Sequence, residues 1–316
     1  MVAIGLSAGA VARIRFAVSA LWEVVAAVRV LRDPGRHAVH RPWARRVTAP
    51  RDTLLWALVP REPAYLPDFL TPPPPGLTAD LGAELARLRA TPAAVVREHL
   101  DLYGRRDPAL RHLYADPAAG LDRLAAEIEA FWQAAVAPHW HRIRLLLDAE
   151  IFARARALAR DGAAGPLNDL HDDVRWAGGT LSVRKHACTA ADVSDGAGLV
   201  LVPSVFVWPS VLSVFAGDVP QLAYPARAVA TLWEPRPEHT GALGAVLGRG
   251  RTRLLLELGA PSSTTELARR TGMTPGGVSQ HLTALRAAGL VAAHRHGRRV
   301  LNVQTPLAEA LISSAP

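Results

Sequence analysis

The chain has little of several residue types that define common function classes. It contains a single cysteine, Cys188, which excludes a disulfide framework and a cysteine-rich zinc site. Aromatic residues make up 6% of the 316 positions and charged residues 20%, while half are hydrophobic. This is the composition of a globular protein rather than a disordered one. A length of 316 residues predicts two domains.

Recognisable targeting and membrane segments are also missing. The N-terminus lacks the charged start, apolar core and cleavage site of a secretory signal. Residues 196–217 form an uncharged run of 22 positions, long enough to span a bilayer. However, Pro203 and Pro209 interrupt the run, and its valines favour buried strands. We therefore expect a cytoplasmic protein without a membrane span.

Positive charge is concentrated near the C-terminus. The chain holds 36 Lys+Arg against 28 Asp+Glu, a net charge of +8. Residues 240–316 contain nine arginines against three acids, a net charge of +6, whereas the first 239 residues carry 27 against 25, or +2. A small basic module attached to a nearly neutral body is typical of a nucleic-acid-binding protein.

The fold class predicted for the chain is α+β, with a mostly helical N-terminal domain over residues 1–235. This domain is expected to be helical over 1–170 and to contain a small antiparallel sheet over 171–230. Ser7 is placed to cap a short helix, and a second helix is expected from Ser19 to Leu31, stopping at Asp33. Further helices are expected over 52–58, from a Thr78 cap to 89, from Pro92 onward, over 121–137 and over 138–160. The predicted strands are a hairpin of 173–177 and 180–186, then 199–202, 205–208, 211–215 and 221–224.

Residues 240–316 predict a winged helix-turn-helix domain. After helices over 243–247 and 251–258, a helix over 263–271 is capped by Ser263, Thr264 or Thr265 and ended by Gly272. A second helix opens at Thr274-Pro275 and ends at Gly289, and such a pair joined by a short glycine turn is a helix-turn-helix. The segments 290–293 and 300–304 flank a basic turn and predict a β-hairpin wing, before a last helix over 305–313. The expected shared core consists of Leu267, Ala268, Val278, Leu282 and Leu285.

The pattern V-S-x-H-L-x-x-L-x-x-A-G-L-V over residues 278–291, with the basic wing after it, resembles the winged helix of ArsR-type bacterial transcription regulators. Stretches such as PHWHRIRLLLDAE and LVLVPSVFVWP are similar to an uncharacterised N-terminal domain of long actinobacterial members of that family. The resemblance implies a homodimer that binds a palindromic operator in double-stranded DNA and usually represses. It does not carry over metal sensing, because the family's sensing cysteines, histidines and aspartates are missing from the corresponding helices.

The start of the second helix offers short polar groups and glycines on the side away from the predicted core. Gln280 can pair bidentately with adenine, and Ser279 can contact a base or a phosphate. Gly276 and Gly277 allow the backbone to approach DNA closely, and the wing arginines suit phosphates or the minor groove. The candidate DNA-binding residues are Thr264, Thr265, Thr274, Gly276, Gly277, Ser279, Gln280, His281, Thr283, Arg286, Arg295, Arg298 and Arg299. No catalytic residue, metal site or cofactor is expected.

Several signals in the first domain have structural interpretations that we favour. The segment G-L-S-A-G over residues 5–9 matches a hydrolase nucleophile elbow, but it lacks a preceding parallel sheet, so Ser7 is expected to cap a helix. The pair His139 and His141, the run 171–173 and Cys188 are expected to be ordinary structural residues.

Two questions stay open at this level. The eight tryptophans either fill the core or line a pocket for a small-molecule effector. The first domain accordingly dimerises, senses an unknown small molecule, or does both. The alternative to a regulator is a small-molecule-binding protein or an enzyme whose winged helix is a protein-interaction module.

Overall fold

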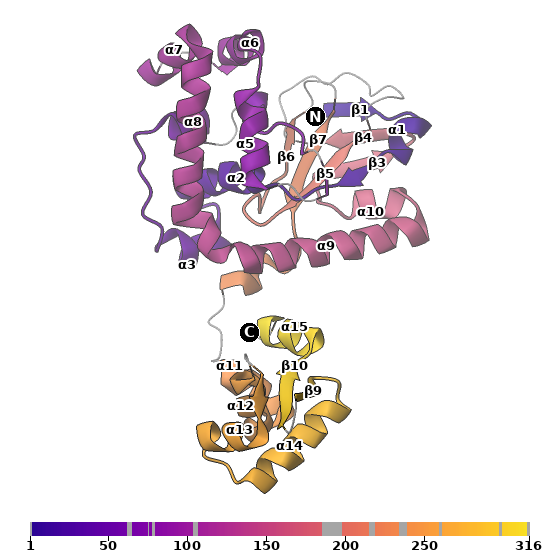
Figure 1. Ribbon diagram of the computed structural model, residues 1–316. Helices are drawn as coiled ribbons and strands as arrows, with labels where there is room; N and C mark the ends of the chain where they lie inside the picture. Colours follow the sequence, from indigo (N-terminus) through magenta and orange to yellow (C-terminus); the bar gives the residue numbers. More distant parts are fainter. Residues whose placement is uncertain are drawn as a thin grey trace. The chain divides into compact units, whose positions relative to one another are not determined.

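The chain divides into two units, a body unit over Met1–Trp233 and a C-terminal unit over Glu234–Pro316 (Figure 1). The computed structural model describes residues 2–61, 65–74, 76–77, 80–103, 107–184, 198–214, 219–233, 239–258, 261–296 and 299–314. Cys188 and the predicted cap Thr78 lie outside these ranges.

Side-chain caps begin most helices of the body unit. Ser7 Oγ accepts from the Ala10 N–H at 3.1 Å, which confirms the predicted cap. Ser19, expected to be the first residue of the second helix, is its cap instead, because Ser19 Oγ accepts from the Trp22 N–H at 3.0 Å. The helix predicted to start at Thr78 is instead capped by Asp80. The helices are α1 (Ala8–Ala12), α2 (Ala20–Arg32), α3 (Arg41–Ala44), α4 (Leu54–Leu58), α5 (Leu81–Arg89), α6 (Ala93–Tyr103), α7 (Pro108–Ala115), α8 (Pro117–Phe131), α9 (Trp140–Asp161) and α10 (Ala164–Asn168).

Two sheets complete the body unit. The predicted hairpin is confirmed as β3 (Val174–Ala177) and β4 (Thr180–Val183), and β1 (Val2–Gly5) extends it in the antiparallel order β1-β4-β3. The second sheet, in the order β2-β5-β7-β6, is mixed, because β2 (Arg15–Phe16), β5 (Val200–Ser204) and β7 (Gln221–Pro225) run parallel while β6 (Leu212–Val214) is antiparallel.

The strand predictions needed three corrections. One antiparallel sheet was expected over 171–230, yet the strands of this segment belong to two sheets, and β5 and β7 of the second sheet run parallel. Residues 1–170 were expected to be helical, yet they contribute β1 and β2, which pair with strands more than 170 residues away. Residues 205–208, expected to be a strand, form a turn. The physical reason for the turn is that the N–H groups of Val205 and Phe206 donate hydrogen bonds to the Glu23 carboxylate. These N–H groups are therefore not available to pair with a neighbouring strand.

The mixed sheet is covered on both faces. Val200 and Val202 of β5 belong to the helical core, whereas Leu199 and Leu201 belong to the core shared with the antiparallel sheet. This burial on both sides accounts for the uncharged residues of β5 within the run 196–217, since strands covered on both faces need no polar side. None of the described helices is long and apolar enough to cross a bilayer.

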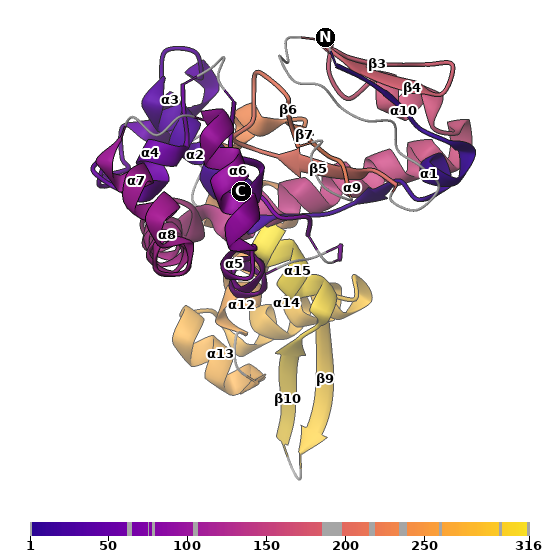
Figure 2. The same ribbon diagram turned by 90° about the horizontal axis from the view of Figure 1, so that it is seen from above.

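The helical side of the body unit is built around α2. Residues 20–31 of this helix are all buried, and all of them except Glu23 and Arg29 are apolar, as expected for a helix that is covered all round. Trp22 Nε1 donates to Gln221 Oε1 and Trp43 Nε1 donates to the Ala135 carbonyl, so these two tryptophans fill the core. Seen from above, α2 to α8 gather on one side of the mixed sheet and the antiparallel sheet lies on the other (Figure 2).

The C-terminal unit is a winged helix-turn-helix, as predicted. Its elements are α11 (His239–Leu247), α12 (Arg249–Glu257), β8 (Ser262–Ser263), α13 (Thr264–Thr271), α14 (Pro275–Ala287), β9 (Val291–His296), β10 (Arg299–Gln304) and α15 (Pro306–Ser314). The five residues predicted to share a core are all buried in one cluster. The short strand β8 was not predicted, and it joins the wing in the order β8-β10-β9. The predicted α+β fold class with a C-terminal winged helix is confirmed.

Candidate nucleic-acid interface

The turn between α13 and α14 is fixed by its capping residues. Ser263 Oγ accepts from the Glu266 N–H at 3.2 Å at the start of α13. Gly272 ends that helix with a φ of +69°, in the left-handed region that favours glycine. Thr274 Oγ1 then accepts from the Gly277 N–H at 3.2 Å, with Pro275 in the first helical position of α14. The sequence therefore sets the beginning of α14 through local contacts alone.

Helix α14 has one buried and one exposed face. Val278, Leu282 and Leu285 are at most 1% exposed and pack in the core of the C-terminal unit. Ser279 and Gln280 lie on the exposed side, and within the described residues their side chains form no hydrogen bond. Their hydroxyl and amide groups are thus available to an external partner. The neighbouring Thr283 hydroxyl donates to the Ser279 carbonyl at 2.9 Å.

The two glycines at the start of α14 differ in their surroundings. A Cβ added at Gly277 would lie 3.2 Å from Thr274 Oγ1, so this glycine accommodates the cap. A Cβ added at Gly276 would have no atom within 4 Å, and the residue is exposed. Packing within the unit therefore gives no reason for a glycine at position 276.

Arg286 connects α14 to the wing. Its Nη2 donates to Asn302 Oδ1 at 2.7 Å, and Asn302 Nδ2 donates to the Ser262 carbonyl at 3.1 Å. Asn302 is fully buried, so this chain of contacts fixes the orientation of α14 relative to β10 and β8. Arg286 has a positioning contact of its own, in addition to its predicted contact with DNA.

His281 is located differently from the other predicted residues of α14. It is half-buried, and a Cβ added at Gly250 would lie 2.7 Å from its Nε2 atom. The imidazole thus packs against the start of α12 instead of belonging to the exposed row of Ser279 and Gln280. A sequence pattern at helical spacing does not separate these flanking positions.

The remaining candidates lie at the helix starts and in the wing. Thr264 and Thr265 begin α13, and Thr265 is exposed. Arg295 and Arg299 belong to β9 and β10, which pair through Val300↔Arg295 and Arg299↔His296. Arg298 lies outside the described residues, between these two strands in the sequence.

The signals in the body unit have local structural partners. Ser7 follows the strand β1, which no local sequence pattern predicts, but it has an ordinary extended backbone with φ −61° and caps α1. His171 Nδ1 accepts from the Asp173 N–H at 3.0 Å, and its Nε2 lies 2.9 Å from the Pro209 carbonyl. No group of three or more His, Cys, Asp or Glu side chains that could hold a metal ion occurs in the part of the chain that the structure describes.

Comparison with known proteins agrees with the division into two units. Residues 252–293, from α12 to β9, match the bacterial regulatory protein arsR family, and residues 89–230 match a family of unknown function, DUF5937. A crystal structure of a predicted DNA-binding transcriptional regulator from E. coli is 32% identical, with 24% of this chain and 85% of that chain covered and a TM-score of 0.21. A search of the curated proteins gave no match.

Proposed function

We propose that this chain, which combines an ArsR-family helix-turn-helix with a DUF5937 body, is a transcription regulator that represses by binding a palindromic operator as a homodimer. The observation that carries the proposal is the exposed polar face of α14. Its first two turns present Ser279 and Gln280 without internal partners, beside the open backbone at Gly276. In a helix-turn-helix, the second helix enters the major groove with its N-terminal residues on base edges.

Each proposed contact has a chemical reason. Gln280 pairs with an adenine edge through its amide, and Ser279 contacts a base or a phosphate. Thr264, Thr265 and Thr274 lie at helix N-termini, where free N–H groups and the helix dipole favour phosphates. The wing arginines 295, 298 and 299 add phosphate or minor-groove contacts. His281 is left out of this set because it packs against α12.

The proposed dimer follows from operator geometry. Two copies related by a two-fold axis place their recognition helices in successive major grooves, about 34–36 Å apart, and so select a palindrome. A small-molecule effector of the body unit would regulate DNA binding only if the effector binds the DNA-bound dimer and the DNA-free dimer with different affinities.

Two substitutions separate base reading from backbone binding. Gln280→Ala should lower the preference for the operator over random duplex about tenfold, because a bidentate base contact contributes roughly 1–3 kcal/mol of discrimination. Binding of random duplex should stay nearly unchanged. Arg298→Ala should weaken operator and random DNA equally, and should reduce the slope of log affinity against log salt by about 1. Affinities are measured by fluorescence anisotropy of the full chain at several salt concentrations.

Matched controls are available in the body unit. Gln133 and Arg45 are exposed, so Gln133→Ala and Arg45→Ala make the same chemical changes far from α14 in the sequence. Gln133→Ala should not alter the operator preference, and Arg45→Ala should not alter the affinity for operator or random duplex. The assignment of α14 to the groove fails if Gln280→Ala weakens operator and random duplex to the same degree.

A further inference from the structure

Helix α9 presents an apolar row on the side opposite its buried face. Ile143, Leu147, Glu150 and Arg154 recur at intervals of three and four residues and are at most 4% exposed. On the opposite side of the helix, Leu145 is 44% exposed and Phe152 is 63% exposed. Leu145 and Phe152 lie seven residues, or about two turns, apart on this outer face, and apolar groups gathered on one face mark a candidate interaction site.

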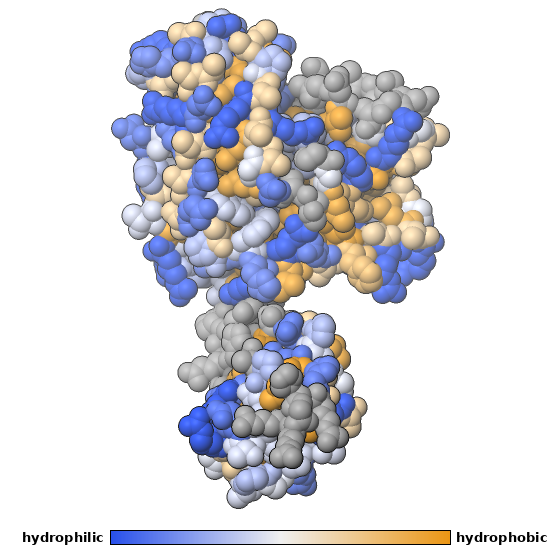
Figure 3. Space-filling view, viewed as in Figure 1, coloured by the Kyte–Doolittle hydropathy of each residue, from blue (hydrophilic) through white to orange (hydrophobic). Residues whose placement is uncertain are grey.

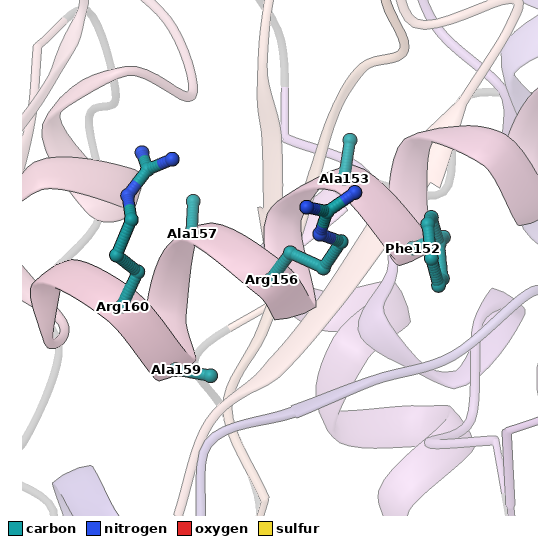
Figure 4. A pocket seen from close by; sticks show the side chains of 6 residues that line it. All are labelled: Phe152, Ala153, Arg156, Ala157, Ala159 and Arg160. Carbon is teal, nitrogen blue, oxygen red and sulfur yellow. The ribbon is translucent and has the colours of Figure 1, made fainter.

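The surroundings of Phe152 are open and shallow. Figure 4 shows the side chains that line an open pocket along α9. Its lining residues are Phe152, Ala153, Arg156, Ala157, Ala159 and Arg160, all from this helix. Small-molecule sites enclose most of their ligand, whereas a single helix face fits an elongated partner. Figure 3 shows apolar surface among hydrophilic residues at the edge of the body unit along which Figure 1 draws α9.

The charges on this face flank the apolar row symmetrically. Asp148 lies four residues before Phe152 and Arg156 four residues after it. Within the chain, Asp148 pairs with Arg144 at 3.0 Å, and the Arg156 guanidinium lies 5.6 Å from the centre of the Phe152 ring. Asp148 and Arg156 are about 12 Å apart along the helix axis, because each residue rises about 1.5 Å. They cannot form an ion pair within one α9.

We propose that this face is a contact between two copies of the chain, in which two α9 helices cross antiparallel at Phe152. A two-fold axis at this residue places Asp148 at the level of Arg156 of the partner subunit, and the same pair recurs by symmetry. It also sets Leu145 beside the partner's Ala159, so that a large side chain meets a small one. Two-fold contacts require such a self-complementary surface.

Geometry allows these interchain pairs. Packed helices have axes about 8–10 Å apart, and in the antiparallel pair Asp148 and Arg156 of the partner subunit lie at the same height, on opposite sides of the outer row. An arginine side chain spans that separation. A second copy is therefore a better match than an unrelated helix, because one surface supplies both members of the ion pair. This contact deepens the proposed dimeric regulator by naming the surface of its body unit that dimerises.

Charge reversal tests the contact in the full-length protein without DNA. Sedimentation equilibrium over roughly 1–100 μM should show a monomer–dimer equilibrium. Asp148→Arg and Arg156→Asp should each raise the dimer dissociation constant at least about tenfold, because each single change juxtaposes like charges twice. The double variant Asp148→Arg/Arg156→Asp should restore it to within about threefold of the unmodified chain. Restoration cannot arise within one helix, given the 12 Å rise.

Two further variants complete the test. Phe152→Ser should also weaken the dimer, and it should fold because the side chain is already 63% exposed. Asp122→Arg reverses an exposed charge on α8, where Asp122 is 72% exposed, and should leave the dissociation constant unchanged. A chain that is monomeric at 100 μM, a dimer indifferent to the α9 variants, or a double variant without restoration would each overturn the proposal. The dimer dissociation constant is measured without DNA, whereas the Gln280→Ala variant is tested by DNA binding. Failure of the proposed α9 contact can therefore be distinguished from failure of the proposed DNA recognition.

Discussion

Replacing Gly276 by alanine separates the stability of the C-terminal unit from its proposed binding of DNA. Gly276 lies in α14, and a Cβ at this position would meet no atom within 4 Å. Alanine in a helix is favoured over glycine by roughly 0.5–1 kcal/mol because it loses less backbone entropy on folding. In a domain of this size that gain raises the melting temperature by roughly 2–8 °C. The free protein should therefore become more stable.

The same methyl group should weaken DNA binding. If the backbone at Gly276 approaches DNA closely, the added Cβ displaces α14 from the groove. We expect a loss of affinity of about tenfold, or about 1.4 kcal/mol, comparable to the loss of one specific base contact. Gly244→Ala in α11 is the matched control, since a Cβ there would meet only an ordinary contact at 3.8 Å from Arg249 Cγ. It should stabilise the unit without changing the affinity for DNA.

The sequence simplifies the measurement. All tryptophan, tyrosine and phenylalanine residues precede position 234, so intrinsic fluorescence reports the body unit alone. Calorimetry or far-UV circular dichroism then follows the C-terminal unit, while fluorescence should be unchanged in both glycine variants. A Gly276→Ala protein that is more stable and binds operator DNA as tightly as the unmodified chain would refute the close approach of α14.

Three further predictions concern stability. Leu282→Ala, at a core position that is 0% exposed, should destabilise the C-terminal unit by about 2–5 kcal/mol, seen by circular dichroism without a change in tryptophan fluorescence. Gly120→Ala should destabilise the body unit by roughly 1–3 kcal/mol, measured by urea unfolding, because its Cβ would lie 3.0 Å from Leu113 Cα. Burial raises the pKa of Glu23 from 4.5 to about 7, against the effect of its N–H donors. The folded protein therefore holds the Glu23 proton more tightly than the unfolded chain does. The resulting contribution to the free energy of unfolding is complete below about pH 4.5 and is lost as the pH rises through 7. Glu23→Gln should reduce the fall in the fluorescence melting temperature between pH 5 and pH 8, and an unchanged slope would contradict this assignment.

Local chemistry made the C-terminal unit predictable. Ser263, Gly272, Thr274 and Pro275 act within a few residues of their own positions, and the core period of α13 and α14 is a local pattern as well. The sequence therefore specified the two helices, their turn and the wing. The short β8 was not predicted, because a segment of two residues is too short to show a hydrophobic periodicity. Only its pairing with β10 defines it as a strand.

Long-range pairing limited the prediction of the body unit. Val2–Gly5 form a strand because Thr180–Val183 lie beside them, and no local signal reports a partner that far along the chain. The turn after β5 depends in the same way on Glu23, which lies about 180 residues earlier and accepts the Val205 N–H at 2.8 Å. The sequence did contain one indication of this turn, the glutamate Glu23 within an otherwise apolar helix. A buried carboxylate requires hydrogen-bond donors, so a distant segment had to supply them.

In the candidate interface, the exposed positions of α14 could be predicted from the sequence, but the contacts of the positions beside them could not. Helical spacing indicated the exposed row that includes Ser279 and Gln280. It did not indicate that His281 packs against Gly250 or that Arg286 holds Asn302, because those contacts depend on how α12 and β10 are arranged around α14. Flanking positions of a helix take their roles from the neighbouring elements.

Selection from a pool of random-sequence duplexes tests whether α14 reads a specific DNA sequence. The full-length protein, at physiological salt, is compared with a Gln280→Ala/Arg298→Ala variant, and bound duplexes are sequenced. We expect enrichment of a palindrome with half-sites about one helical turn apart, and its loss in the variant. No enrichment by the unmodified protein, or the same palindrome selected by the variant, would contradict recognition of DNA through α14.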